Sequence, residues 1–184
     1  RYPIYLDKGI MHYAKEYWNF CSSLVLAGIF AQIVVIIMNW ALMRWSGAGE
    51  QALFGAAWQF NLLLSYIFSP YAEVMKREFA VLQTDSEVLA KHFHFSLKLI
   101  FWLTAFPAIF IATFSDWILP LIYGDKYSNA TLVTVIIMFY TIYQAWGQLT
   151  GSFFIATEKT KANAIIGIVG QILTLVFVFL FQIP

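Results

Sequence analysis

Six of the carboxamide side chains that lie inside long apolar stretches are the groups of this sequence with the clearest chemistry. They are Gln32, Asn39, Gln59, Asn61, Gln144 and Gln148. An amide is neutral and both donates and accepts hydrogen bonds. Within apolar helices, such groups bind either a neutral polar ligand or a polar group on a neighbouring helix. The residue types leave both roles open.

Aromatic side chains accompany these amides and offer ring faces for stacking. They are Trp58, Tyr140, Tyr143 and Trp146. Gln144 and Gln148 are four residues apart, which places them one turn apart on the same face of a helix. The rings can face a ligand, the helix core or lipid.

Other chemistry has little support in the sequence. His92 and His94 are two residues apart, so they point to different helical faces, and we predict no metal site. Asn129-Ala130-Thr131 matches a glycosylation pattern that a helix N-cap explains equally well. No Ser/His/Asp set, glycine-rich phosphate loop or pair of carboxylates is recognisable. We therefore predict no catalytic residue, no cofactor and no enzymatic activity.

The composition predicts an integral membrane protein. Hydrophobic residues make up 61% of the 184 residues and charged residues only 11%, against about a quarter in ordinary soluble domains. The formal net charge of +1 gives no reason to expect nucleic acid as a partner. The uncharged run from Tyr127 to Thr157 is about long enough to cross a bilayer.

We predict an all-α, polytopic bundle with five transmembrane helices. Their approximate ranges are 19–43, 51–72, 86–123, 128–157 and 162–182, after a cytoplasmic or interfacial arm at 1–18. From Ile10 to Cys21 the arm is amphipathic, which fits either a helix in the headgroup region or an extension of the first membrane helix.

Local signals predict where these helices begin, bend and end. The glycine-rich segment Arg44–Gly49 marks a turn, and Thr84–Glu87 has capping-box spacing that places a helix start near Asp85 or Ser86. Pro107 predicts a kink, and Ser128 or Asn129 is the expected N-cap of the fourth helix. Small residues four apart at Gly147 and Gly151 predict close packing with another helix.

The distribution of Lys and Arg predicts a cytoplasmic N-terminus. Nine of the eleven fall in the N-terminal arm, the second connection and the fourth connection, while only Arg44 and Lys126 lie on the other side. Arg1 opens the chain without a methionine, and five helices leave a bundle incomplete. We therefore expect this chain to be a piece of a longer protein.

Two segments resemble a known family. Residues 116–127 read DWILPLIYGDKY and precede a helix that ends at Ala156-Thr157-Glu158-Lys159. Residues 47–58 read GAGEQALFGAAW. Both resemble the polysaccharide flippases, the O-antigen and capsule exporters of the multidrug/oligosaccharidyl-lipid/polysaccharide exporter superfamily. The acidic residue that this family often has late in the first helix of a lobe is replaced by Asn39.

The resemblance, which covers about residues 20–184, implies a function. Such proteins have two lobes of six helices, so the chain resembles the first five helices of one lobe. We favour the C-terminal lobe, because the N-terminal arm resembles a linker from a preceding helix. The implied protein is a multi-pass flippase of the bacterial inner membrane that moves polyprenyl-diphosphate-linked oligosaccharide for O-antigen, capsule or exopolysaccharide assembly. Implied partners are the bilayer, the lipid-linked oligosaccharide, the second lobe and polysaccharide assembly proteins.

This function implies roles for the residues named above. The six amides, with Trp58 and Tyr140, are candidates for the substrate pathway, because a sugar head group needs a polar route through hydrocarbon. Arg44 and Lys98 are candidates for the diphosphate, unless they only extend to the interface. No ionised residue lies at the middle of a span, so we expect no ion-coupling site here.

Three other functions remain open from the sequence. A multidrug exporter of the same superfamily would be distinguished by a mid-membrane Asp or Glu in further helices. A membrane-embedded polysaccharide polymerase or ligase would be expected to carry Arg and His in a large outer loop, whereas the outer connections here are short. A membrane scaffold without transport activity is the third.

Overall fold

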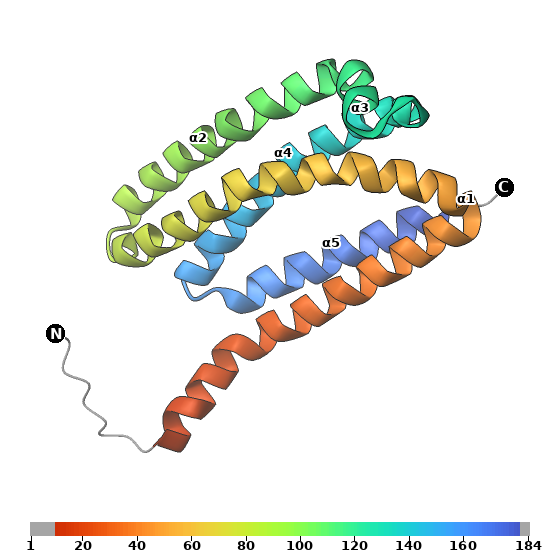
Figure 1. The fold of residues 1–184 in the computed structure, drawn as a ribbon. Helices are drawn as coiled ribbons and strands as arrows, with labels where there is room; N and C mark the ends of the chain where they lie inside the picture. The colour runs from red at the N-terminus through yellow and green to blue at the C-terminus, as the bar shows by residue number, and fades with distance from the viewer. Residues whose placement is uncertain (1–9, 181–184) are drawn as a thin grey trace. The chain divides into compact units, whose positions relative to one another are not determined.

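The computed structural model describes residues 10–180, which are helical with short turns and contain no strand. The elements are α1 (Ile10–Leu82), α2 (Ser86–Thr113), α3 (Ser115–Tyr123), the 3₁₀ helix η1 (Asp125–Ala130), α4 (Thr131–Ala156) and α5 (Thr160–Leu180). Four helical stretches in this part of the chain are long and apolar enough to cross a membrane: α1, α2, η1 with α4, and α5. The predicted all-α class is therefore confirmed, and these four apolar helices fit the predicted membrane bundle (Figure 1).

Helix α1 contains both of the first two predicted membrane helices. Its 73 residues would be about 110 Å long if straight, far more than the roughly 30 Å of a hydrocarbon core. Gly47 interrupts it with φ 84° and ψ 172°, so two helices meet there without a loop. The predicted break at Arg44–Gly49 is found, but it is a single residue rather than a turn of several residues.

The amphipathic segment before the first predicted membrane helix belongs to α1. Helical structure begins at Ile10 and continues through Asn19 without interruption, which is the extension of the first membrane helix that the sequence left open as one of two alternatives. The rest of the predicted arm, residues 1–9, lies outside the described residues. The polar stretch after Ala72 is helical too, because α1 continues to Leu82.

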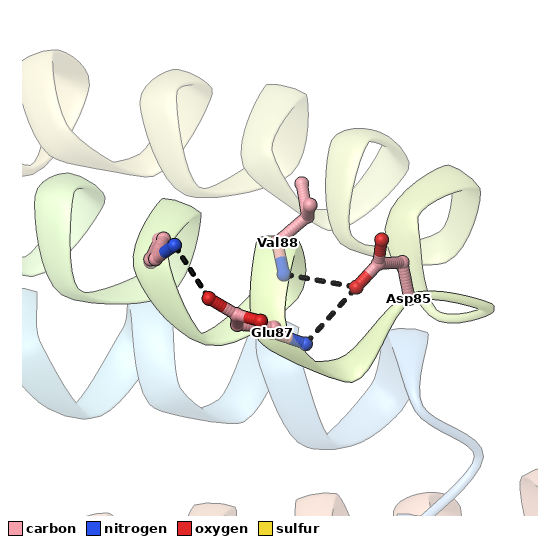
Figure 2. A network of polar contacts seen from close by, with 4 residues as sticks. Asp85, Glu87 and Val88 are labelled. Carbon is pink, nitrogen blue, oxygen red and sulfur yellow. Dashed lines mark hydrogen bonds and ion pairs between the residues drawn. The ribbon is translucent and has the colours of Figure 1, made fainter.

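Helix α2 starts at Ser86 because Asp85 caps it. One carboxylate oxygen of Asp85 accepts hydrogen bonds from the backbone N–H groups of Glu87 and Val88, each at 3.1 Å (Figure 2). The predicted start is confirmed. The capping residue is Asp85, however, so the capping box that would have used Thr84 does not form.

Replacing the cap should weaken the α1–α2 hairpin. We expect Asp85→Ala to lower the free energy of unfolding by about 1 kcal/mol, because two helix N–H groups lose their acceptor. Thr84→Ala, the matched control, should change stability by less than about 0.5 kcal/mol. SDS titration of the protein in mixed micelles would measure both. Equal effects of the two substitutions would contradict this account of the cap.

The helix predicted over residues 86–123 is two helices. Phe114, with φ −102° and ψ 13°, separates α2 from α3. The Ser115 hydroxyl donates to the carbonyl of Ala112 at 2.9 Å, a local side-chain bond of the kind that competes with helical structure. Pro107, where a kink was predicted, lies inside α2 and does not end it.

The connection into α4 also differs from its prediction. Gly124, with φ 87° and ψ 167°, ends α3 and leads into η1. Helix α4 follows η1 directly, and its N-cap is Ala130, with no side-chain hydrogen bond. The predicted N-caps Ser128 and Asn129 are therefore wrong, because both residues belong to the 3₁₀ helix.

Two compact units make up the chain. Residues 39–157 form one of them, and its helices pack in a definite register. Ring contacts pair Trp58 with Tyr140 and Phe79 with Phe153, so the numbering rises together in α1 and α4 and these helices run parallel. Helix α2 runs antiparallel to both, since the Ser96 hydroxyl donates to the sulfur of Met75 and His92 lies beside Phe79. Fully buried large side chains of this unit include Phe68, Phe79, Ile100, Leu119, Met138 and Leu149.

The other unit consists, in the described residues, of residues 10–38 of α1 and residues 158–180, which contain α5. Figure 1 shows α5 beside this part of α1. Helix α5 begins at Thr160, two residues before its predicted start. Its predicted last residues, 181 and 182, lie outside the described residues.

Candidate functional site

The polar groups between α1 and α4 meet one another directly. Asn61 is 1% exposed, and its side-chain oxygen accepts a hydrogen bond of 2.9 Å from the Thr141 hydroxyl. The same hydroxyl lies 2.8 Å from the carbonyl of Ile137 in its own helix. A hydroxyl carries one proton, so it is shared between these two acceptors. Asn61 therefore serves helix packing.

A second interhelical bond lies further along the same pair of helices. The Ser69 hydroxyl donates to the side-chain oxygen of Gln148 at 3.1 Å. Ser69 precedes Pro70, which has no N–H to offer the turn before it. This bond gives Gln148 the packing role that the sequence left open beside a ligand role.

Gln144 lies one turn before Gln148, but its side-chain oxygen does not form a comparable hydrogen bond. Its side-chain oxygen is buried and has no hydrogen-bond partner among the described residues. The structure therefore separates two amides that their spacing had grouped.

A continuous series of aromatic rings follows the α1–α4 contact. Phe54 stacks on Trp58 at 5.7 Å between ring centroids, Trp58 lies 5.8 Å from Tyr140, and Tyr140 lies 6.4 Å from Tyr143. Tyr143 is 73% exposed and Tyr140 is 44% exposed. We call these four residues the aromatic series. It brings the predicted residues Trp58 and Tyr140 together.

The remaining predicted pathway residues lie apart from this contact. Gln59 is exposed next to the buried Phe60, on a face of α1 that also carries the exposed Tyr66. Asn39 and Gln32 are exposed as well, and Gln32 belongs to the other compact unit. Of the eight predicted pathway residues, those in or next to the α1–α4 contact are Trp58, Asn61, Tyr140, Gln144 and Gln148.

The two predicted phosphate residues are exposed. Arg44 lies three residues before the break at Gly47, and Lys98 shares the exposed face of α2 with Trp102 and Phe106. A lysine above exposed rings fits an interfacial position. Two other basic residues of the second connection, Lys76 and Lys91, pair with Glu73 and Glu87 on their own helices.

Sequence reasoning missed Ser69 and Thr141 as the partners of the amides. Ser and Thr are common in membrane helices and usually bond to their own helix, so neither residue stands out. The one available signal is position. Thr141 lies three residues before Gln144, which puts it close to the same helical face as the predicted amides.

Two further expectations concern metal binding and glycine packing. In the described residues no cluster of His, Cys, Asp or Glu could hold a metal ion. His92 contacts the ring of Phe79 at 6.1 Å, and its Nε2 atom is buried without a partner. A methyl group added at Gly147 would meet nothing within 4 Å beyond its own helix, so no described helix packs closely at that position.

Removing the Thr141 hydroxyl should destabilise the α1–α4 contact. We expect Thr141→Val to lower the free energy of unfolding by about 1 kcal/mol, because Asn61 loses its donor while the shape of the side chain is kept. Thr134→Val is the matched control, since Thr134 is equally buried in α4 but bonds only to the carbonyl of Ala130. SDS titration should show loss for Thr141→Val alone. Equal loss for both would mean that the interhelical bond contributes nothing.

No protein-family model, no curated protein and no solved structure matches this chain.

Proposed function

We propose that this chain belongs to a membrane transporter that flips lipid-linked oligosaccharide across the bacterial inner membrane. The substrate class is a polyprenyl diphosphate carrying an O-antigen, capsule or exopolysaccharide repeat unit. The two segments at residues 47–58 and 116–127 that resemble polysaccharide flippases support this proposal.

The aromatic series is the structural observation that carries the proposal. Sugar rings have C–H faces that stack on aromatic rings, and Tyr and Trp combine an apolar body with a polar tip. Trp58, Tyr140 and Tyr143 form such a surface beside Gln144, in helices without a charged residue from Gln51 to Ala72 or from Tyr127 to Thr157. A neutral surface of this kind suits the hydroxyl-rich part of the substrate better than an ion.

The proposal includes five membrane crossings. Residues 10–46 and 48–82 of α1 would each make one, and α2, α4 and α5 the other three. The parallel register of residues 48–82 with α4 is what alternating crossings require, since both would then run from the outside to the cytoplasm. The turns after Leu82 and after Ala156 would both be cytoplasmic, where the basic residues concentrate.

Transport by the full-length protein in proteoliposomes would test the proposal. A fluorescent lipid-linked oligosaccharide is placed in both leaflets, and a glycosidase added outside removes the glycan that it can reach. We expect the protein to expose the inner-leaflet glycan, whereas protein-free liposomes keep that fraction protected. No acceleration for this substrate, together with export of a lipophilic cation, would replace the proposal by a multidrug exporter.

A further inference from the structure

The side-chain oxygen of Gln144 is an acceptor with no hydrogen-bond partner among the described residues. This Oε1 atom is buried, and in the described residues only Ser23 Oγ and His92 Nε2 share this condition. A buried acceptor without a donor loses its hydration and receives no hydrogen bond in return. Such a group therefore needs a donor that the described residues do not supply.

The neighbouring amides do not share this need. Asn61 accepts from Thr141 and Gln148 accepts from Ser69, so both amide oxygens are satisfied between α1 and α4. Gln144 lies one turn from Gln148 on the same helix. Gln144 and Gln148 have the same residue type, lie on the same helix and are both partly buried. The lack of a donor is therefore specific to the position of Gln144.

Exposed aromatic rings and a position with open space lie next to Gln144 in the sequence of α4. Tyr140 lies one turn before it and contacts Trp58, and Tyr143 directly precedes it and is largely exposed. Gly147 follows three residues later, with no heavy atom within 4 Å of the position a methyl group would take beyond its own helix. Gln144 therefore has aromatic side chains at and before its own turn, and open space beside Gly147 in the turn that follows.

We infer that Gln144 binds the transported substrate by accepting a hydrogen bond from one of its sugar hydroxyl groups. This inference rests on the proposed function. A hydroxyl is the matching group because the free atom is an acceptor, whereas a diphosphate offers only acceptors at neutral pH. Tyr140 and Trp58 would stack on the same sugar, so that Gln144 selects the orientation of its hydroxyl groups.

The test compares Gln144→Met with Gln148→Met in the full-length protein. Methionine keeps nearly the same length and removes the amide. We expect Gln144→Met to weaken binding of the lipid-linked oligosaccharide by about 2- to 10-fold. Its melting temperature should equal or exceed that of the parent protein, since an unpaired acceptor is removed. Gln148→Met should lower the melting temperature, because the Ser69 hydroxyl loses its acceptor.

Binding is measured in nanodiscs with the oligosaccharide lipid and with undecaprenyl diphosphate that carries no glycan. Two results would overturn the inference and leave the proposed function in place. One is unchanged affinity of Gln144→Met for the oligosaccharide lipid, and the other is a drop in its melting temperature equal to that of Gln148→Met. A parent protein that binds both lipids equally would overturn the proposed function as well.

A cysteine variant keeps the inference testable if Gln144→Met does not fold. Gln144→Cys, in a background free of other cysteines and carrying Cys21→Ser, is treated with a membrane-impermeant thiol reagent. We expect labelling that the oligosaccharide lipid slows and undecaprenyl diphosphate does not. Thr134→Cys, at a fully buried position of the same helix, is the control. Labelling at position 144 no faster than at position 134 would overturn the inference.

Discussion

Phe79→Ala should be the most destabilising single substitution proposed for this chain, at about 3 to 5 kcal/mol. Phe79 is fully buried near the end of α1, and its ring lies 5.6 Å from Phe153 of α4, 5.7 Å from Phe93 and 6.1 Å from His92 of α2. Three helices meet on this one side chain. Its loss would leave a cavity that none of them can fill without moving.

SDS titration or thermal unfolding in detergent would measure the effect of Phe79→Ala. The control is Val81→Ala, two residues later on the same helix, where the side chain is 74% exposed. It should change the free energy of unfolding by less than about 0.5 kcal/mol. A loss below about 1 kcal/mol for Phe79→Ala would mean that the three helices do not depend on this ring.

Gly47→Ala should cost about 1 to 3 kcal/mol for a reason unrelated to packing. A methyl group at this position meets nothing within 4 Å, so there is space for it. The cost comes from the backbone, because φ 84° with ψ 172° is a conformation that essentially only glycine adopts. Alanine would force the two helices of α1 to join in another way.

Gly49→Ala provides a close control for Gly47→Ala. Gly49 is also exposed with open space around it, but its φ is outside the positive range, within the helical run. Alanine there should be neutral or stabilising by about 0.5 to 1 kcal/mol, since glycine is a poor helix residue. The two variants are compared by thermal unfolding. If Gly49→Ala is less stable than Gly47→Ala, the positive φ of Gly47 does not require glycine and this account is wrong.

Local sequence signals predicted the helix starts and breaks that depend on a single residue. The Asp85 cap and the Gly47 break follow from side-chain chemistry and backbone freedom within a few residues. The break at Phe114 was missed because no glycine or proline stands beside it, and the bond of the Ser115 hydroxyl to Ala112 is of a kind that Ser65 also makes inside the uninterrupted part of α1. The replacement of the predicted N-caps of α4 by a 3₁₀ helix was missed because Gly124 starts a new element one turn earlier.

The sequence predicted which residue types form the candidate site, but not which residues form hydrogen bonds with one another. Asn61 and Thr141 are 80 residues apart and Ser69 and Gln148 are 79 apart, so their contacts depend on the register of α1 against α4. No local pattern fixes that register. The distinction between Gln144 and Gln148 has the same origin, because the partner Ser69 lies on another helix.

The proposed transport depends on the proposed five crossings, and single-cysteine labelling in intact cells tests these crossings most directly. In a cysteine-free background, cysteines at Thr84 and Lys159 should react with an impermeant reagent only after the membrane is opened. Cysteines at Gly49 and Lys126 should react from outside without that treatment. Labelling of positions 84 and 159 from opposite sides would contradict the five crossings, the shared direction of residues 48–82 and α4 through the bilayer and the proposed export of oligosaccharide.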